Sequence, residues 1–359
     1  PNQALSLLAA ASLTGLLSAQ SVDVVPDEFT NVDAIRMLHV PGISGEWRHQ
    51  ILIGAQHLNA MLGHQITALE YRRSKSTYAL PATSGNATVA LSIAPSSPIA
   101  CSAQFAVNAG TTPTQVFQGT VLAPASPAEP GPNIAWDADN TVRIQFQQSF
   151  VYAGGTLCID ITGANLPGQE PKWWPIDATL EDLPGTTTDL GGGCGIYGGQ
   201  TSAWSHVEAR SLVPGGNADM HANGTPGSLA ICAIGTPNAA GGVSLAMLGF
   251  PAPAGCELKL ATMDLLFATT FVPATHPLFA AAGGRADVSI PLPAIPEAIG
   301  FSLATQWLDW SQSASSNAIE WTVASAIPSL DMAIVEGHPS EASGNRYVYM
   351  APVLRFEHQ

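Results

Sequence analysis

Apolar and polar residues alternate with a period of two along much of the chain, whereas the 3.6-residue period of amphipathic helices is scarce. The alternation is clearest in segments 88–93, 142–147 and 157–162, and clusters of Pro, Gly and Asn separate these runs. It continues in segments 243–247, 256–260, 288–292, 301–305, 319–323 and 330–334. This pattern predicts short antiparallel strands, each with one buried face and one wet face.

The segment 46–62 is the one place where a helix competes with this interpretation. Its apolar residues form no continuous stripe, so we expect its first half to be another strand.

A change in composition near residue 184 divides the chain. The segment 184–227 is dense in glycine and short of apolar runs, and alternation returns at Ser228. We therefore expect an all-β protein of two antiparallel β-sandwich domains, jelly-roll or immunoglobulin-like, joined by a Gly-rich linker. The expected divisions are a signal peptide at 1–20, a first sandwich at 21–184, a linker at 185–227, a second sandwich at 228–337 and a tail or closing strand at 338–359.

Residues 4–17 form an uncharged apolar run, and Ser18-Ala19-Gln20 follows it. The run is shorter than the roughly 20 residues that span a bilayer. Its length and the small residues after it are typical of a secretory signal peptide, and a buried N-terminal helix is the alternative. We expect a protein that is secreted or held in the cell envelope, with no membrane span in its mature form.

Only 11% of the residues are charged, against about 25% in average soluble proteins. The surface must therefore be covered largely by Ser, Thr, Asn, Gln, Gly and Pro. This composition excludes coiled coils and helical bundles. The 12 basic and 27 acidic residues give a net charge of −15. This balance argues against nucleic acid or an anionic membrane as a partner.

The five cysteines have neither a CxxC motif nor the spacing of a zinc site. In an oxidising compartment they are expected to form disulfides, and an odd count leaves at least one of them without an intramolecular partner. The spacing does not fix the pairing of Cys101, Cys158, Cys194, Cys232 and Cys256.

Several short motifs carry a family resemblance. The segments 193–195, 255–258 and 301–307 read Gly-Cys-Gly, Gly-Cys-Glu-Leu and Phe-Ser-Leu-Ala-Thr-Gln-Trp. They resemble the C-terminal β-sandwich module of large secreted proteins from planctomycete-type bacteria. The run 155–160 and the later Trp-Trp pair resemble the β-domain that often precedes this module. The resemblance covers most of residues 40–337. It implies mainly export and a β-sandwich fold, because such proteins are largely uncharacterised and their activities therefore give no further guide.

The same resemblance implies a disulfide between Cys194 and Cys256. Cys256 alternates in phase with Leu258 and Leu260, which would place the bridge against the core.

The Trp173-Trp174 pair is the most suggestive surface feature. Neighbouring residues of an extended segment point to opposite faces, so one indole can be buried while the other is exposed. An exposed indole could stack on a sugar ring while Lys172 or Asp177 binds the hydroxyl groups, and Trp204 has a similar loop setting. The alternative is that both indoles cap the end of the sandwich. The candidate ligand-binding residues are Trp173, Trp174, Asp177 and Trp204.

Asp137, Asp139 and Asn140 place three oxygen-bearing side chains within four residues. Calcium prefers such ligands, so these residues are a candidate calcium site. The alternative is an ordinary turn, in which Asp and Asn are common for conformational reasons.

Four histidines, His39, His49, His57 and His64, lie close together in sequence, and neutral imidazoles bind transition metals. Their spacing fits neither a strand nor a helix, so we expect ordinary surface and turn histidines instead.

A second metal hypothesis concerns the Gly-rich segment. His206 and His221 lie there with Glu208 and Asp219 nearby, and loops often carry function.

The sequence contains no nucleophile elbow, HExxH motif, phosphate loop or dinucleotide fingerprint. No catalytic residue is therefore predicted. The sequence favours a secreted, non-catalytic envelope or matrix protein that is structural or binds extracellular glycans or envelope components. One alternative is a secreted hydrolase acting on polysaccharide or ester substrates. Another is a self-assembling shell or filament protein.

Overall fold

The computed structural model describes residues 20–195, 205–238, 241–273 and 283–359; the expected signal peptide and Trp204 lie outside these ranges. Within them the chain forms antiparallel β-sheets and a few short helices, so the expected all-β class is confirmed. None of the helices in the described ranges is long and apolar enough to cross a membrane. The helices are η1 (Asp27–Phe29), η2 (Ala55–Met61), η3 (Pro98–Ala100), α1 (Phe105–Asn108), η5 (Leu245–Leu248) and η7 (Pro296–Ala298).

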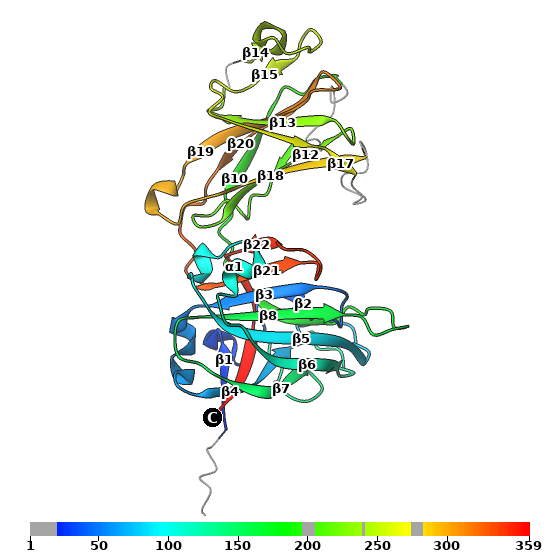
Figure 1. Cartoon of the computed structure of the whole chain (residues 1–359), viewed down its shortest axis with the longest axis vertical. Helices are drawn as coiled ribbons and strands as arrows, with labels where there is room; N and C mark the ends of the chain where they lie inside the picture. Colours follow the sequence, from blue (N-terminus) through cyan, green and yellow to red (C-terminus); the bar gives the residue numbers. More distant parts are fainter. Residues whose placement is uncertain (1–19, 196–204, 239–240, 274–282) are drawn as a thin grey trace, which may run out of the picture.

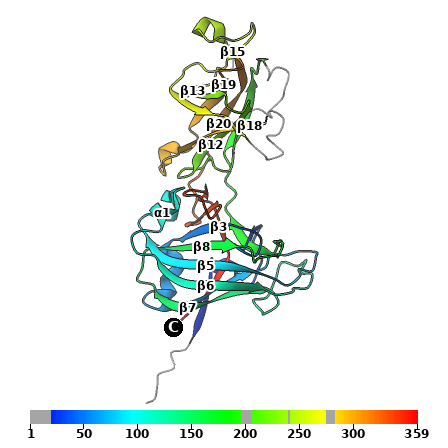
Figure 2. The same cartoon turned by 45° about the vertical axis from the view of Figure 1, so that its right-hand side comes forward.

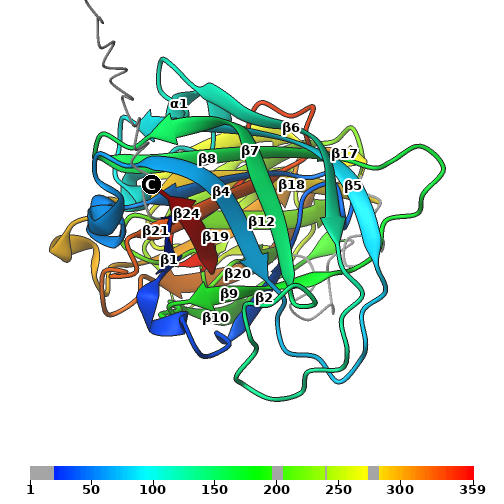
Figure 3. The ribbon, with the colours of Figure 1, turned by 90° about the horizontal axis from the view of Figure 1, so that it is seen from below.

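Three sheets form the lower part of the molecule in Figure 1. The six-stranded sheet has the order β22 (Asn345–Tyr347), β21 (Met332–Gly337), β3 (Arg48–Ile53), β8 (Thr156–Ala164), β5 (Thr83–Ala94) and β6 (Thr114–Ala123). The four-stranded sheet has the order β1 (Ser21–Val25), β24 (Leu354–His358), β4 (Gln65–Arg72) and β7 (Thr141–Val151). The third sheet has the order β2 (Arg36–His39), β9 (Pro175–Leu180) and β23 (Met350–Pro352). Figure 3 shows β24, β4 and β7 side by side at this end.

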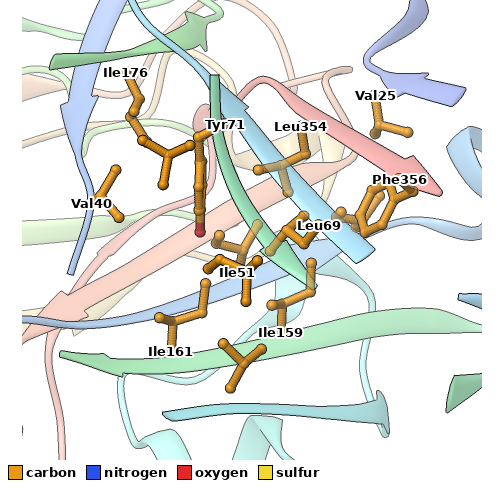
Figure 4. Packing of buried hydrophobic residues seen from close by; sticks show 14 of the residues in the cluster. Val25, Val40, Ile51, Leu69, Tyr71, Ile159, Ile161, Ile176, Leu354 and Phe356 are labelled. Atoms are coloured by element: carbon orange, nitrogen blue, oxygen red, sulfur yellow. The ribbon is translucent and has the colours of Figure 1, made fainter. Parts of the chain in front are cut away.

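The core of this lower group lies between its sheets and is built from alternate strand residues. Figure 4 shows Ile51, Ile159 and Ile161 of the six-stranded sheet facing Leu69 and Phe356 of the four-stranded sheet. All five side chains are fully buried. Burying an aliphatic or Phe side chain of this size contributes roughly 1.5–3 kcal/mol, so this core is the main stabilising element of the lower group.

The upper group, seen from a second side in Figure 2, contains three more sheets and its own core. Its five-stranded sheet has the order β10 (Thr186–Gly191), β20 (Ala314–Thr322), β19 (Ser302–Asp309), β13 (Leu229–Gly235) and β16 (Leu265–Thr270). A second sheet has the order β11 (Ser205–Val207), β12 (Asn217–Gly224), β18 (Gly284–Pro291) and β17 (Val272–Pro273). The third is the pair β14 (Val243–Ser244) and β15 (Glu257–Leu258). The two large sheets enclose the indoles of Trp307 and Trp321.

The end of the chain returns to the lower group, which corrects the expected boundaries. The segment 330–334 was expected in the second sandwich, but β21 pairs with β3 over the whole length of both strands. In the segment 338–359, β24 lies between β1 and β4. Alternation specifies that one face of a strand is buried, but it does not specify which sheet the strand joins.

The expected Gly-rich linker at 185–227 is also wrong, because three strands of the upper group lie in it. Strand β12 pairs with β18 over eight residues, and Ala218, Met220 and Ala222 are buried. Small residues such as these give only a weak alternation signal, and the surrounding glycines obscure it.

Two further strand predictions need correction. In the alternating segment 157–162, Leu157, Ile159 and Ile161 share one face, so Cys158 was expected on the wet face. It is fully buried instead, because it packs in a separate apolar cluster that also contains Cys101 and Phe105. In the segment 243–247, the strand ends at Ser244 and a short helix follows, which leaves Met247 exposed. The strand expected in the first half of 46–62 is confirmed as β3.

Candidate functional site

The two neighbouring tryptophans have opposite surroundings. Trp174 is 0% exposed, packs in the lower core and donates its indole N–H to the carbonyl oxygen of Pro124 at 3.2 Å. Trp173 is 55% exposed. The extended backbone entering β9 therefore places one indole in the core and the other at the surface.

Asp177 is not a surface residue, which corrects its proposed contact with a ligand. It lies on β9, is fully buried, and forms an ion pair with Arg72 at 2.5 Å. It also accepts a hydrogen bond from the backbone N–H of Ala34 at 2.8 Å. The carboxylate is thus enclosed by protein partners and stabilises the lower core; it cannot reach a sugar.

A second exposed tryptophan, Trp47, lies close to Trp173. Trp47 is 38% exposed, and its ring centroid lies 4.5 Å from that of His39. The Trp173 ring centroid lies 6.0 Å from the same imidazole. We call Trp47, Trp173 and His39 the aromatic face. Trp47 belongs to no sequence motif, because it is a single tryptophan in front of a strand.

The loop between β2 and β3 positions this aromatic face. Gly42 has a φ of +84°, and its N–H donates to Gly45. A Cβ on Gly163 would lie 1.9 Å from the Gly42 nitrogen, so the loop packs backbone to backbone against β8. The carbonyl of Trp47 accepts the N–H of Gly163 at 2.8 Å. These contacts fix Trp47 beside the sheet.

One cavity is lined by Trp47 of the aromatic face, and a second is lined by the sequence neighbour of Trp173. Trp47 lines a cavity of about 820 Å³, the Trp47 cavity, together with Glu46, Glu336, His338, Glu341 and Asn345 among others. Lys172, the neighbour of Trp173, lines another cavity of about 900 Å³ with Arg143, Gln169 and Glu170. Hydrogen-bonding groups therefore line the cavity at Trp47, and others lie near Lys172, next to Trp173 in sequence.

Behind the aromatic face, two of the four clustered histidines meet a carboxylate. The Nε2 atoms of His39 and His49 lie 3.1 Å apart, and Nε2 of His49 lies 3.2 Å from Oε1 of Glu336. The ligand atoms of all three residues lie within 4.8 Å of one another. The spacing argument failed because the β2–β3 loop reverses the chain, and Glu336 comes from the distant strand β21.

Burial controls the protonation of this group. Burial, with a smaller contribution from His49, lowers the pKa of His39 to about 4, so its imidazole is neutral at pH 7. Burial alone would raise the pKa of Glu336, but its interactions with His49, and to a smaller extent with His39, outweigh this effect, and the pKa lies below its usual value. The group thus offers a neutral imidazole and a carboxylate.

The other two clustered histidines have different partners. The ring of His57 contacts the carbonyl oxygen of Leu330 at 2.8 Å. The Nδ1 atoms of His64 and His358 lie 2.7 Å apart, and Nε2 of His358 lies 2.6 Å from Asp23. Neither histidine joins His39 and His49.

The second histidine hypothesis concerns residues that lie near one another but do not converge on one point. The rings of His206 and His221 are stacked with centroids 6.3 Å apart. Nδ1 of His221 lies 2.5 Å from Asp287, and Nε2 of His206 lies 3.8 Å from Glu208. Ser289 donates to Asp219 at 2.5 Å. Within the described ranges, the three residues whose potential metal-ligand atoms lie close together are His39, His49 and Glu336.

The candidate calcium residues form a turn before β7. Asp137 accepts the backbone N–H of Asn140 at 3.0 Å, and buried Asn140 accepts the hydroxyl of Ser126 at 2.7 Å. Asp137 and Asp139 are exposed. These contacts account for Asp137 and Asn140 as turn residues. Calcium binding here stays a prediction.

The disulfide between Cys194 and Cys256 is present, with Cα atoms 5.3 Å apart. It packs in an apolar cluster with Leu258 and Leu260, as the resemblance implied. Cys101, Cys158 and Cys232 are buried free thiols.

Comparison with known proteins adds no family. No protein-family model matches the chain, and no curated protein matches it. Among solved structures, the crystal structure of the infectious bursal disease virus VP2 subviral particle gives a TM-score of 0.15 at 12% identity, over 95% of this chain and 76% of that chain. A likeness this weak carries no argument about fold or function. The resemblance to secreted proteins of planctomycete-type bacteria stays a prediction.

Proposed function

We propose that this protein is an exported, non-catalytic glycan-binding protein of the cell envelope or extracellular matrix. In this proposal the two groups of sheets are two β-sandwich domains, and the second is inserted into the first between β9 and β21. The glycan binds to the first domain, on the aromatic face.

The observation that carries the proposal is the exposure of two indoles around one imidazole. Trp47 and Trp173 keep 38% and 55% of their surface in solvent, although large aromatic side chains gain most by burial. Both lie in segments that precede a strand, Trp47 before β3 and Trp173 before β9, and loops commonly carry function. Apolar ring faces flanked by hydrogen-bonding side chains suit a sugar, which has an apolar face and a rim of hydroxyl groups.

Polar side chains around the Trp47 cavity supply the hydrogen-bonding partners. His338 lies 3.5 Å from Glu46, both side chains are about half exposed, and Asn345 lines the same cavity. These groups donate and accept hydrogen bonds without a strongly basic patch. They therefore favour neutral or weakly charged glycans over sulfated ones.

A glycan array tests the proposal with the wild-type protein and the variants Trp173→Ala and Trp47→Ala. Trp310→Ala is the matched control, because Trp310 is 44% exposed but packs against Phe250 in the upper group. We expect wild type and control to bind the same glycans, and each aromatic-face variant to bind about tenfold more weakly or worse. Absence of any glycan signal, or equal losses in all three variants, would refute the proposal.

The same samples distinguish the alternatives. Release of free sugar from a bound glycan would identify a hydrolase. Oligomers that grow with protein concentration in size-exclusion chromatography, without glycan binding, would identify a self-assembling protein.

A further inference from the structure

Three buried ligand atoms converge from three strands, one of which is distant in sequence from the other two. His39 ends β2, His49 lies near the start of β3, and Glu336 lies near the end of β21. His49 is completely buried, and the Glu336 side chain is 14% exposed. Their ligand atoms lie within 4.8 Å of one another. Such a convergence costs desolvation energy, so it needs a favourable interaction to balance that cost.

Protons alone do not satisfy this group. Nε2 of His49 makes both short contacts, at 3.1 Å to His39 and at 3.2 Å to Glu336, but it can carry only one proton. Within the described ranges, Oε1 of Glu336 has no hydrogen-bond partner. Buried polar atoms without partners are uncommon in native proteins and point to an ion or water that would pair with them.

Two of the three separations between ligand atoms suit a small divalent cation, and the third pair lies within 4.8 Å. Zinc binds His nitrogen at about 2.0–2.1 Å and carboxylate oxygen at about 2.0–2.2 Å, which places tetrahedral ligand atoms about 3.3 Å apart. The two short contacts in this group are close to that separation. Two imidazoles and one carboxylate also form a donor set typical of zinc and related transition metals, whereas calcium and magnesium prefer oxygen ligands alone.

We propose that His39, His49 and Glu336 bind one zinc-class divalent cation. Glu336 also lines the Trp47 cavity, so solvent or a ligand group can occupy the remaining coordination position from that side. The cation would join the β2–β3 loop to β21 and thereby fix the imidazole on which Trp47 and Trp173 pack. This site goes beyond the proposed glycan binding and does not depend on it.

Zinc binding to the full chain is the first test. After treatment with a chelator, the wild-type protein is titrated with Zn²⁺ alone by calorimetry, and bound zinc is counted by elemental analysis. We expect one tight site. Glu336→Gln and His39→Gln should each weaken it by about 100-fold or more, since even loss of a residue that only supports a metal ligand costs 10- to 100-fold. The matched control His206→Asn removes an exposed histidine and should bind like wild type.

Fluorescence tests the location of the cation. The ring centroids of Trp47 and His39 lie 4.5 Å apart. Cu²⁺ bound in place of zinc should therefore quench part of the tryptophan emission. Trp47→Phe should keep the stoichiometry but lose that part of the quenching. Near-ultraviolet circular dichroism first shows whether each variant is folded. Glu336→Gln and His39→Gln test the site separately, so the test stands if one of them fails to fold.

Several results would overturn the site. One is a folded wild-type protein that binds no zinc tightly. Another is a folded Glu336→Gln or His39→Gln variant that binds zinc like wild type. A third is loss of binding in His206→Asn, which would place the cation at the upper group. None of these results affects the array test of Trp173, so the two proposals fail separately.

Discussion

At the residue scale, neighbouring side chains with the same chemistry have different roles. Trp173 and Trp174 differ only in the face of the backbone from which they project, yet one is 55% exposed and the other is enclosed in the core. Function and stability are therefore separable at this pair.

Replacing each tryptophan of this pair by alanine should give very different stabilities. Trp174→Ala removes a fully buried indole and its hydrogen bond to Pro124, so it should lower the free energy of unfolding by about 3–5 kcal/mol. Trp173→Ala should change it by no more than about 0.5 kcal/mol, as at other surface positions. Urea denaturation measures both values. Similar losses in the two variants would show that Trp173 is a structural residue.

The buried carboxyl group of Asp33 should make stability depend on pH. Burial, together with the nearby Asp177, raises the pKa of Asp33 to about 6 from a usual value of 3.8. Its side chain is enclosed, and it accepts the backbone N–H of Lys75 at 3.1 Å. The folded state therefore keeps this proton when the unfolded state has lost it, and stability falls as the pH rises from about 4 to 6.

The variant Asp33→Asn isolates this effect. Because Asn cannot ionise, the variant should not share the loss of stability that wild type shows as the pH rises. The difference in free energy of unfolding, variant minus wild type, should therefore increase by up to about 3 kcal/mol between pH 4 and pH 7. Denaturation at a series of pH values measures the difference. A constant difference across this range would contradict the predicted protonation of Asp33.

Part of the aromatic face was predictable from sequence. An extended Trp-Trp pair requires opposite orientations, and this rule correctly separates Trp173 from Trp174. The burial of Asp177 was not predictable, because its partner Arg72 lies more than a hundred positions earlier on another sheet. The contact of His39 and His49 with Glu336 was hidden for the same reason. Sequence spacing describes neighbours within one element, not elements that meet through a fold.

At the element scale, the disulfide fixes a part of the upper group that has little regular structure. Strands β14 and β15 have two residues each, and the short helix η5 lies between them. Cys256 joins this segment to Cys194, whose backbone N–H donates to Ser315 on β20. The bridge therefore attaches a weakly paired segment to the five-stranded sheet.

Loss of this bridge should destabilise the protein. It closes a loop with a sequence separation of 62, for which the chain-entropy relation gives about 4 kcal/mol. Cys194→Ser should lower the free energy of unfolding by up to that amount, and a reducing agent should lower the wild-type value equally. The variant itself should be insensitive to the reducing agent. Equal stability of reduced and oxidised wild type would contradict this role.

Alternation predicted strands better than it predicted their neighbours. It located β5, β7 and β8 because their inward residues are strongly apolar. It missed β12, whose inward residues include two alanines, and it assigned β21 to the wrong group of sheets. Strand pairing depends on contacts between segments hundreds of residues apart, which a local period does not record.

At the scale of the whole molecule, Arg346 links the two groups of sheets. It lies on β22 in the lower group and donates to the carbonyl of Cys101 at 2.7 Å. It also donates to the carbonyl of Gly216 at 2.5 Å and to the side chain of Asn217, beside β12 of the upper group. This half-buried guanidinium therefore joins the two groups through three hydrogen bonds.

The aromatic face lies on the lower group, whereas the disulfide lies on the upper group. Ligand binding is therefore proposed for the lower group alone. In the folded protein, we expect the glycan to lie on Trp47 and Trp173.

The most direct measurement is the NMR signal of each indole N–H during titration with the oligosaccharide that binds best on the array. The proposed glycan binding predicts that the signals of Trp47 and Trp173 shift together and saturate, while those of buried Trp174 and exposed Trp310 stay in place. Shifts at Trp310 without shifts at Trp47 and Trp173, or no saturable shift at any indole, would contradict it.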